Sequence, residues 1–599
     1  MDRLGHGPLL GDGANGTMLA QLGYHQTPIE TANLNAPDMV KRVHAAYFEA
    51  GSDFVETNTY GANRFKLGSH VDSLTEINLR GAQIAREACP YGRYVLGAIG
   101  PAGMHMQPIG SIPEQEIVES IQAQSLALVQ GGVDGIILES FVDMAELVVS
   151  VRAVQAVTGL PIIVSKAFIE DGEALAEGLP SRCARELSEL GVAAIGANCV
   201  VGPQRMVDIV RQFSEHSNLP VLAFPTPGLP QLVKGAIVYD TDPQYFGAAC
   251  ARLIEEGALI VGGCCGTTPE HIAVLRSCMD KGIKRLARVQ TRSGEKIAEK
   301  PVPVAEKTMM AQKLGKEFLI TVELDLPRGL NVEKVLQGAA ALKEKGADLI
   351  DISDGARARL RMNPMSISTL IQNQVGIEVV MHFACRDRNL LAVQADLLGC
   401  HALGIKNILA ITGDPANIGD YPSATSVFDV DSIGLVRIMS RFNEGIDLAG
   451  NTVGMKCAYT IAVAFNPLAQ DIDNEMDRLR RKVDAGAHVV YTQPLFEQAA
   501  IDRAVDLASR ESVPLVVGVL PLRSCRHAEF MHNEVPGISI PDWLRKKMAE
   551  APDDDTALAI GVGEAQQLCI EVKAKAQGVY LMPPFGNHRI AEQVISAIR

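Results

Sequence analysis

Short apolar runs alternate with helix-length segments along the whole chain. In the first half, eight of these runs have the length and the near-continuous apolar character of buried strands: residues 9–12, 53–56, 94–97, 135–139, 161–164, 193–196, 220–223 and 258–261. Strands of this kind that alternate with helices are typical of a parallel sheet with both faces covered. Eight such units predict a closed (β/α)8 barrel of the TIM type.

An open, doubly wound sheet is the alternative for this half. It would require a nucleotide-binding glycine fingerprint directly after the first strand. Residues 11–16 are rich in glycine, but their glycines do not have that spacing. The barrel is therefore the favoured architecture.

The second half of the chain repeats the pattern. Its apolar runs are residues 318–323, 349–352, 379–382, 408–411, 459–463, 489–492, 515–519 and 579–582. The segments between them are amphipathic, and residues 476–483 run into a helix stop at residues 484–487. These runs predict a second barrel of the same kind.

The fold class is therefore α/β, with two tandem (β/α)8 TIM-type barrels in residues 1–280 and 309–599. Residues 281–308 lie between them and carry no long apolar run. They are polar and basic and contain Pro301 and Pro303. We expect this segment to be an interdomain linker.

The composition limits the environment of the protein. The 599 residues carry a formal net charge of −15, which argues against a nucleic-acid-binding surface. No run approaches the roughly 20 apolar residues that span a bilayer, and the first residues lack an apolar segment of signal length. Twelve cysteines are spread over the whole length, unlike a secreted disulfide framework. We expect a cytoplasmic protein that binds neither nucleic acid nor membranes, and a homo-oligomer is compatible with the sequence.

The most distinctive stretch is residues 262–266, where Cys264 and Cys265 stand within a glycine frame after an apolar run. Neighbouring side chains of a regular strand point to opposite faces, so the two thiols can share a target only where the backbone is irregular. The flanking glycines permit such a backbone. Cys199 also follows an apolar run. Three thiolates with one open position describe a catalytic zinc site.

Two other interpretations of these thiols stay open. Adjacent cysteines at a strand end can be ordinary packing residues. Cys264 or Cys265 could instead be a covalent nucleophile. No obvious His or Asp partner stands close by in the sequence, and three converging thiols suit a metal better.

Polar side chains gather where the predicted strands end, which is where chemistry lies in this fold. In the first half these are Glu56, Asn58, Glu139, Asn198, Cys199, Cys264 and Cys265. In the second half they are Glu323, Ser353, Asp354, His382, Gly413, Asp414 and Gln493. A carboxyl group buried in a barrel mouth, such as that of Glu323, has a raised pKa and can donate a proton.

Four motifs of the first half together resemble the homocysteine S-methyltransferase family: Asp12-Gly13-Ala14-x-Gly16-Thr17, Glu56-Thr57-Asn58-Thr59, Gly196-x-Asn198-Cys199-x-x-Gly202-Pro203 and Gly262-Gly263-Cys264-Cys265-Gly266-Thr267-Thr268-Pro269. The resemblance covers about residues 1–280. It implies that Zn2+ is held by Cys199, Cys264 and Cys265. It also implies that the amino-acid end of homocysteine is held by Asp12, Glu56, Asn58 and Glu139. Glu139 can equally be an ordinary strand-end carboxylate. Thr226 departs from the family, which usually has an asparagine there.

The second half resembles methylenetetrahydrofolate reductase from about residue 310 to the end. The resemblance rests on Glu323 with Pro327-Arg328, Ser353-x-Gly355-Ala356, His382-x-x-Cys385, Ile411-Thr412-Gly413-Asp414-Pro415, residues 479–487 and Thr492-Gln493. It implies FAD contacts by Ser353, Ala356, His382, Thr412, Gly413, Asp414, Phe465, Arg481 and Lys482. The last two are cations suited to a pyrophosphate.

The same resemblance implies that NAD(P)H reduces the flavin and that 5,10-methylenetetrahydrofolate then takes its place. Glu323 would be the catalytic acid on the bridging nitrogen of the folate, and Asp414 and Gln493 would orient the pterin. Asp325 and Ala384 depart from the family, as does the sequence after Pro521 and around residues 584–587. The contacts to the folate tail are therefore not predicted.

Together the two resemblances imply a bifunctional enzyme of methionine synthesis. The methyl donor stays open. A cobalamin signature, Asp-x-His-x-x-Gly, is absent, because no His has an Asp two positions before it. The donor would be methyltetrahydrofolate, directly or through a separate cobalamin protein, or a sulfonium. Two alternatives remain, namely a non-catalytic zinc-binding scaffold with a degenerate, colourless reductase half, and a methyltransferase for a different thiol.

Overall fold

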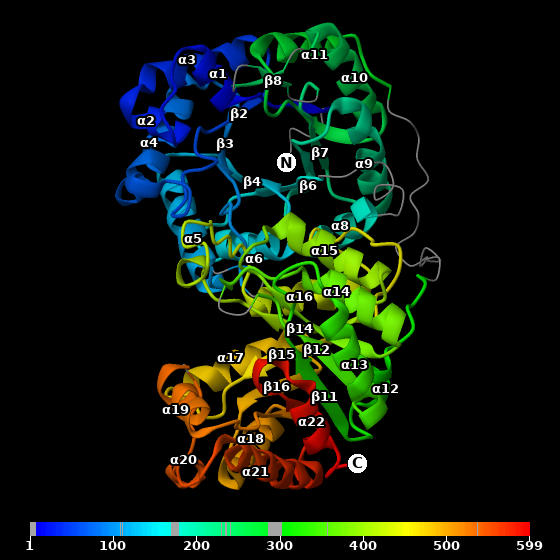
Figure 1. The fold of residues 1–599 in the computed structure, drawn as a ribbon. Helices are drawn as coiled ribbons and strands as arrows, with labels where there is room; N and C mark the ends of the chain where they lie inside the picture. Colours follow the sequence, from blue (N-terminus) through cyan, green and yellow to red (C-terminus); the bar gives the residue numbers. More distant parts are fainter. Residues whose placement is uncertain are drawn as a thin grey trace. The chain divides into compact units, whose positions relative to one another are not determined.

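The computed structural model describes residues 7–107, 110, 112–168, 179–228, 231–233, 236–239, 241–284, 302–355, 358–535 and 537–599. The chain divides into two compact units (Figure 1). The N-terminal unit contains residues 1–107, 112–300 and 448–452. The C-terminal unit contains residues 108–111, 301–447 and 453–599. Each unit is built around its own parallel sheet.

The N-terminal unit holds eight parallel strands in the order β1-β10-β7-β6-β5-β4-β3-β2. Their bounds are β1 (Leu9–Leu10), β2 (Phe54–Glu56), β3 (Tyr94–Ile99), β4 (Gly135–Phe141), β5 (Ile162–Lys166), β6 (Ala194–Asn198), β7 (Val221–Phe224) and β10 (Ala258–Val261). The two ends of this order meet, because Asp53 N–H donates to Leu10 O over 2.6 Å. The predicted first barrel is confirmed, with all eight strands where the apolar runs put them.

Helices surround this barrel (Figure 1). They are α1 (Asn15–Gln21), α2 (Ala32–Asn35), α3 (Pro37–Glu49), α4 (Leu74–Ala88), α5 (Glu114–Gln130), α6 (Met144–Gln155), α8 (Leu179–Ser188), α9 (Pro203–His216), α10 (Pro243–Glu255) and α11 (Pro269–Asp280). An antiparallel hairpin of β8 (Gln231–Val233) and β9 (Ala236–Val238) follows β7, and the apolar pattern did not predict it. No apolar run of strand length marks it.

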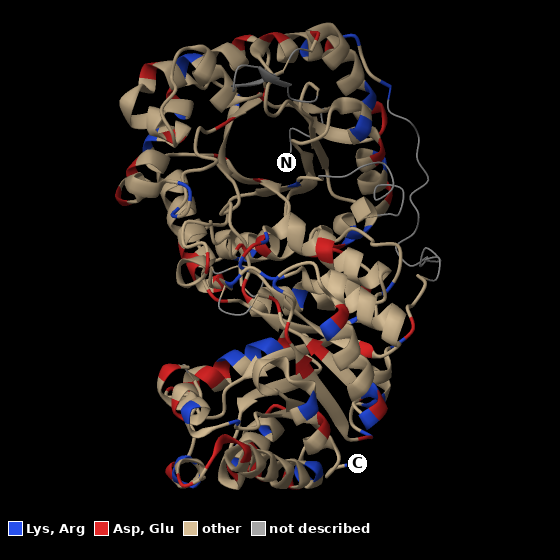
Figure 2. Cartoon of the chain, viewed as in Figure 1, with Lys and Arg blue, Asp and Glu red and all other residues tan. Residues whose placement is uncertain are grey.

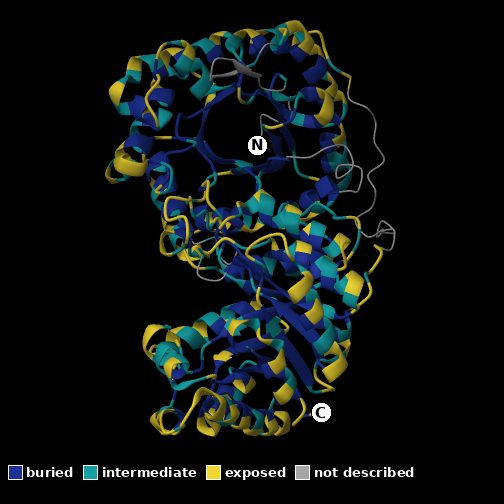
Figure 3. Cartoon of the chain, in the orientation of Figure 1, coloured by how far each residue is buried: buried dark blue, intermediate teal, exposed yellow. Residues whose placement is uncertain are grey.

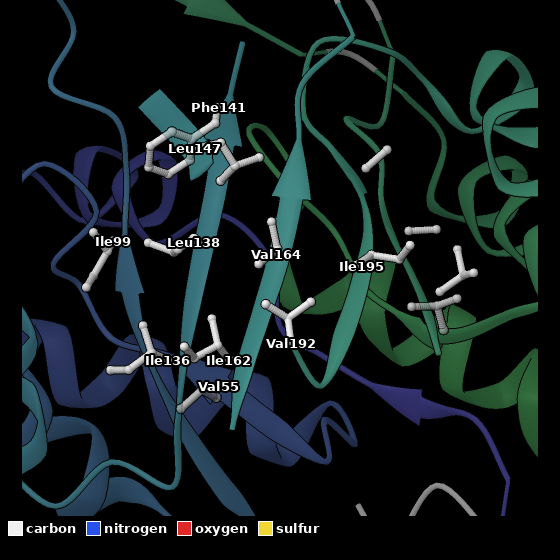
Figure 4. Close-up of a cluster of buried hydrophobic side chains, with 14 of the residues drawn as sticks. Val55, Ile99, Ile136, Leu138, Phe141, Leu147, Ile162, Val164, Val192 and Ile195 are labelled. Carbon is white, nitrogen blue, oxygen red and sulfur yellow. The ribbon is translucent and has the colours of Figure 1, made fainter. Parts of the chain in front are cut away.

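The two faces of the strands build two layers of core. Ile136 and Leu138 pack between the sheet and the helices (Figure 4), whereas Ile137 faces the barrel interior with Phe54 and Phe224. This alternation follows from the two-residue period of a strand. Because both faces are buried, the strands read as continuous apolar runs. In Figure 3 the strands are buried and the exposed residues lie on the outer helices and loops.

The C-terminal unit is a closed barrel in strict chain order, β11 to β18. The strands are β11 (Leu319–Leu324), β12 (Leu349–Ile352), β13 (Glu378–Ala384), β14 (Asn407–Ile411), β15 (Thr460–Phe465), β16 (Val489–Pro494), β17 (Leu515–Val519) and β18 (Gly578–Leu581). All neighbouring pairs are parallel, and β18 pairs with β11 to close the ring. The predicted second barrel is thus confirmed as well.

The helices of this unit are α12 (Met309–Lys313), α13 (Glu333–Lys345), α14 (Pro364–Leu370), α15 (Leu390–Ala402), α16 (Ser432–Glu444), α17 (Ile472–Asp484), α18 (Gln498–Arg510), α19 (Cys525–Glu534), α20 (Asp542–Ala549), α21 (Asp554–Lys575) and α22 (His588–Ile595). Local chemistry sets their ends. For α17, the Asp471 side chain accepts from Asn474 N–H over 3.0 Å, and Gly486 follows the helix with a φ of +117°. A capping carboxylate and a left-handed glycine satisfy backbone groups that a helix leaves free.

Residues 285–301 of the expected linker lie outside the described residues. Its last part is described: Lys456 N–H donates to Pro303 O over 2.7 Å, and Ala305 N–H donates to Lys456 O over 2.9 Å. Charged side chains concentrate on helices and loops, with both signs interspersed (Figure 2). Within the described residues, no helix combines the length and the apolarity that crossing a bilayer requires.

Candidate active sites

The three predicted zinc ligands come together at the carboxyl end of the N-terminal barrel. Cys199 directly follows β6, and Cys264 and Cys265 lie in the loop after β10. Their sulfur atoms all lie within 4.8 Å of one another, and the Sγ atoms of Cys199 and Cys265 are 3.7 Å apart. No other group of three or more potential metal ligands converges in this way among the described residues.

Irregular backbone on both segments turns these thiols toward one point. Cys199 has a φ of +58°, which is uncommon for a residue with a side chain. The loop is nevertheless fixed, because Cys199 N–H donates to Phe224 O over 2.9 Å and Cys264 N–H donates to Pro225 O over 3.0 Å. Backbone strain that is held in place by its surroundings is a feature of functional sites.

The glycine frame acts differently from the expectation. Only Gly266 takes a left-handed conformation, with a φ of +82°. Gly262 and Gly263 are needed for space, because a Cβ atom would lie 2.7 Å from the Phe224 ring at the first position and 2.3 Å from the Thr267 hydroxyl at the second. Gly262 and Gly263 therefore let the double-cysteine loop pack tightly onto the barrel, and only Gly266 supplies an unusual dihedral angle.

The separation of the sulfurs fits a tetrahedral metal. Zinc–sulfur bonds of about 2.3 Å at the tetrahedral angle place two sulfurs about 3.8 Å apart, close to the 3.7 Å between Cys199 and Cys265. A disulfide would need about 2.05 Å. Hydrogen bonds from its two thiol neighbours lower the pKa of Cys199 to about 3, while the hydrogen bond with Cys199, burial and the charge of Cys199 raise the pKa of Cys265 to about 12. Without a bound cation, only one of the three thiols would therefore be ionised near neutral pH, whereas a metal would stabilise all three as thiolates.

Asn198, the last residue of β6, connects the thiols to the neighbouring strand ends. Its Nδ2 donates to Glu139 Oε2 over 3.0 Å and to Ser140 Oγ over 2.7 Å, and lies 3.8 Å from Cys264 Sγ. Its Oδ1 accepts from Ser140 N–H and from Ser165 Oγ, each over 2.8 Å. One amide therefore orients a carboxylate and one of the three clustered thiols together. Asn198 stands in the cysteine motif, but the sequence pattern predicted no role for it.

Three predicted homocysteine-binding carboxyl groups form a buried cluster beside the thiols. Asp12 Oδ2 accepts from Glu56 N–H over 2.9 Å. Burial, the charges of Glu139 and Asp12 and a hydrogen bond with Glu139 raise the pKa of Glu56 well above its usual range. Burial and the charge of Cys199 raise the pKa of Glu139 to about 7. Within the described residues, Asp12 Oδ1 and Glu56 Oε1 have no hydrogen-bond partner although both are buried.

Asn58, the fourth of these predicted residues, is occupied by structural contacts. Its Nδ2 donates to Asn33 Oδ1 over 3.1 Å and to Ile29 O over 3.4 Å. Asn33 in turn donates to Asn58 O over 2.8 Å. These bonds hold the loop after β2 in place. They already use the Nδ2 atom of Asn58 as a donor.

In the C-terminal barrel, Glu323 on β11 accepts a short hydrogen bond from the Tyr580 hydroxyl on β18. Burial raises the pKa of Glu323, and this effect outweighs the opposing effects of His382 and of the Tyr580 hydroxyl. The group can therefore hold a proton above the usual carboxyl range. Tyr580 was predicted as a strand residue only, and nothing in the sequence distinguished it from other aromatic strand residues.

His382 on β13 lies beside a buried acid that the sequence analysis did not single out. Its Nε2 is 3.6 Å from Asp351 Oδ1. Burial disfavours the imidazolium, but Asp351 and Glu323 together outweigh burial and raise the pKa of His382. Asp351 is fully buried, and within the described residues neither of its oxygens has a hydrogen-bond partner. The signal was available, since Asp351 interrupts the apolar strand Leu-Ile-Asp-Ile.

Most of the other predicted cofactor and folate residues lie at or just after the carboxyl ends of β12 to β16, and two lie on α17. Ser353 comes after β12, Thr412, Gly413 and Asp414 come after β14, Phe465 ends β15, Gln493 lies in β16, and Arg481 and Lys482 lie on α17. Ala356 lies outside the described residues. Lys482 is buried, donates to Ala464 O over 2.7 Å, and has its pKa lowered to about 8 by burial. A Cβ atom at Gly413 would lie 3.0 Å from the Ala384 side chain, so this loop approaches β13 closely.

The family comparisons divide the chain at the same place as the two barrels. Residues 9–279 match the family model for homocysteine S-methyltransferase, and residues 308–584 match that for methylenetetrahydrofolate reductase.

Among curated proteins, methionine synthases from Mycobacterium leprae (strain TN) and Mycobacterium tuberculosis (strain ATCC 25618 / H37Rv) are each 33% identical over 310 and 309 residues. The matched region is 48% of this chain but only 26% of each relative, so the chain spans about a quarter of their length.

Among solved structures, the homocysteine methyltransferase MmuM from Escherichia coli aligns in its metallated form with 19% identity and a TM-score of 0.39. The alignment covers 45% of this chain and 96% of that one. The family matches and the two confirmed barrels lead to one assignment. The chain combines a homocysteine S-methyltransferase domain in its N-terminal unit with a methylenetetrahydrofolate reductase domain in its C-terminal unit.

Proposed function

We propose that this protein is a bifunctional enzyme of methionine synthesis. The N-terminal barrel methylates homocysteine at a zinc ion held by Cys199, Cys264 and Cys265. The C-terminal barrel reduces 5,10-methylenetetrahydrofolate to 5-methyltetrahydrofolate with FAD and NAD(P)H. The observation that carries the proposal is the convergence of three thiols from two distant segments within 4.8 Å.

In the first barrel, Cys199, Cys264 and Cys265 would hold the zinc ion, and three thiolate ligands would leave one position open for the substrate. Zinc, when bound, supplies a Lewis acid that lowers the pKa of a thiol in that fourth position. Asn198 holds Cys264 and Glu139 in a fixed relation through one amide. The substrate sulfur would therefore meet a preorganised site rather than one that assembles around it.

The buried carboxyl cluster suits the other end of the same substrate. Asp12 and Glu56 each keep a buried oxygen without a hydrogen-bond partner among the described residues. An unpaired buried carboxylate is costly, and a cation that donates several hydrogen bonds removes the cost. The α-ammonium group of an amino acid is such a cation. This supports homocysteine over a thiol without an amino group.

In the second barrel, Glu323 holds the proton that the folate needs. Protonation of the bridging nitrogen breaks its bond to the methylene carbon and leaves an iminium ion, which accepts a hydride. FAD, when bound, carries the electrons from NAD(P)H to the folate. Arg481 and Lys482 would hold its phosphates, and Ser353, His382, Thr412, Gly413 and Phe465 would contact the rest of the cofactor. Asp414 and Gln493 orient the pterin.

The two proposed activities form a sequence, because the product of the second barrel carries the methyl group that the first one needs. No residue of this chain provides the cobalamin signature. Incubating the pure protein with homocysteine and methyl-labelled methyltetrahydrofolate tests direct transfer. Labelled methionine without any added cobalamin protein supports it. If label appears only with such a protein, or only from a sulfonium donor, direct transfer is excluded.

Metal analysis and an absorption spectrum test both halves together. We expect about one zinc per chain and a yellow protein that NAD(P)H bleaches. The Cys199→Ser variant should lose zinc and homocysteine methylation but keep the flavin, and Cys278→Ser, a half-buried thiol outside the cluster, is the matched control. Methylation that survives in Cys199→Ser would refute the zinc site. A colourless protein would favour the scaffold alternative for the second barrel.

A further inference from the structure

Two ionisable groups meet inside the C-terminal barrel, and the proposed mechanism gives their contact no function. Asp351 on β12 is fully buried, and His382 on β13 is 7% exposed. His382 Nε2 is 3.6 Å from Asp351 Oδ1. Within the described residues, neither oxygen of Asp351 and not His382 Nε2 has a hydrogen-bond partner. A buried charge needs a partner of opposite sign, so each group compensates the other for its burial.

The register of the parallel strands explains why these side chains meet. Asp351 is the Cα partner of Glu323 on β11 and of Val380 on β13. Val380 belongs to the hydrophobic cluster inside the barrel. His382 follows Val380 by two positions, so its side chain points to the same interior face. Glu323, Asp351 and His382 therefore face the barrel interior from three neighbouring strands.

The charge on these strands depends on His382. The described strands β11 to β18 contain no Lys, no Arg and no other His, so His382 is their only residue that can become a cation. Their acids are Glu323, Asp351 and Glu378. Glu378 begins β13 and accepts from Met309 N–H over 2.6 Å, at the end of the strand away from His382. The state of one imidazole thus decides whether the interior offers a positive charge.

The groups around His382 favour the charged ring. Burial disfavours the imidazolium, but Asp351, Glu323 and Asp354, which follows β12, together outweigh burial and raise the pKa of His382. Tyr580 on β18 also faces the ring, with the two ring centres 6.2 Å apart at an interplanar angle of 66°. Burial and the nearby acids raise the pKa of Tyr580, so it stays neutral. Asp351 is the acid in contact with the imidazole.

We propose that Asp351 is a positioning residue that holds the His382 ring with Nε2 toward the barrel interior and keeps it positively charged toward the flavin. The inference rests on the proposed reductase function, in which His382 contacts the cofactor. Hydride transfer from NAD(P)H adds two electrons and one proton to the flavin, which therefore gains one negative charge. A fixed imidazolium stabilises that charge, whereas a neutral imidazole does not. Asp351 thereby makes the reduction of the flavin more favourable.

Two measurements on the full-length, flavin-loaded enzyme test this role. Carbon-13 NMR of labelled histidine follows the pKa of His382, whose signal is assigned by its loss in His382→Asn. Equilibration with a reference dye gives the reduction potential of the flavin at pH 7. The variants are Asp351→Asn, which keeps the shape but removes the charge, His382→Asn and the double variant. Glu378→Gln is the matched control, because this acid lies on the strand of His382 but at its far end.

Asp351→Asn should lower the pKa of His382 by about 1–3 units, as for the loss of an opposite charge at this distance. The equilibrium between oxidised and reduced flavin should shift about tenfold toward the oxidised form, which is a fall of about 30 mV for two electrons. In the His382→Asn background, the change Asp351→Asn should not lower the potential again, because Asp351 acts through His382. Glu378→Gln should keep both wild-type values.

An unchanged pKa of His382 in Asp351→Asn would overturn the pairing. A potential that stays the same or rises in this variant, or that falls equally with and without His382, would overturn the effect on the flavin. The histidine titration does not require a bound flavin, so it still tests the pairing where a variant loses the cofactor. A wild-type protein that NAD(P)H does not reduce would refute the reductase function, which is a separate outcome.

Discussion

Replacing Tyr580 by Phe removes one hydroxyl group from the interior of the C-terminal barrel. Tyr580 is 6% exposed, and its hydroxyl donates to Glu323. The phenylalanine ring fills the same space, so the change removes a hydrogen bond without creating a cavity. That bond stabilises the carboxylate form and opposes the effect of burial on the pKa of Glu323. Its loss should therefore raise this pKa further.

A hydrogen bond to a charged group is worth about 1.5–3 kcal/mol, and one pKa unit corresponds to about 1.4 kcal/mol. The pKa of Glu323 should therefore rise by about 1–2 units in Tyr580→Phe. In the proposed mechanism Glu323 acts in its protonated form, so the rate of folate reduction should fall as the pH rises through this pKa. In the variant that fall should move to higher pH by the same 1–2 units.

The assay is the pH dependence of flavin reoxidation by 5,10-methylenetetrahydrofolate. Tyr491→Phe is the matched control. The ring centre of Tyr491 lies 5.4 Å from that of Tyr580, and removing the Tyr491 hydroxyl leaves the hydrogen bond from Tyr580 to Glu323 intact. The control should keep the wild-type profile. A shift of the fall to lower pH in Tyr580→Phe, or an equal shift in both variants, would show that this hydroxyl does not set the proton affinity of Glu323.

Three further changes test the two barrels. Glu323→Gln should abolish folate reduction but leave flavin reduction by NAD(P)H intact in stopped-flow traces; loss of both steps would contradict a role confined to the folate. Asn198→Ala should weaken zinc binding roughly 10- to 100-fold in a chelator competition, as for other residues that orient metal ligands; unchanged affinity would contradict it. Asp53→Ala removes the acceptor of Leu10 N–H and an ion pair with Arg276. The free energy of unfolding of the N-terminal unit, measured with urea, should fall by about 1–3 kcal/mol. A fall of less than about 0.5 kcal/mol would contradict the role of Asp53 in joining β1 and β2.

The apolar runs predicted the barrels well for a physical reason. A parallel strand that is buried on both faces has to be apolar at nearly every position, so each strand stands out against the helices. Polar residues at the ends of these runs then mark the active edge. The hairpin β8–β9 was not predicted, because it belongs to a loop and not to the barrel. A strand outside the barrel does not have to be apolar at nearly every position, so no apolar run of strand length marks this hairpin.

Residue pairs across strands were harder to predict. The cysteine motif showed that a metal site was present, but the bond from Asn198 to Glu139 joins residues 59 positions apart. The bond from Tyr580 to Glu323 joins residues 257 positions apart. Such partners depend on the register of the closed sheet, which the apolar pattern of single strands does not determine. The reason for the glycines at 262 and 263 was likewise a matter of packing that only the folded loop reveals.

Both candidate sites share a property that supports ligand binding independently of any motif. Buried polar atoms in proteins are nearly always paired, because each unpaired one costs free energy. Asp12 Oδ1 and Glu56 Oε1 in one barrel and both oxygens of Asp351 in the other lack partners within the described residues. The first pair lies beside a thiol cluster and suits an ammonium group, and the second lies beside a histidine whose charge it favours. Their positions beside the thiol cluster and beside His382 fit the charges that the proposed substrates and reactions would bring.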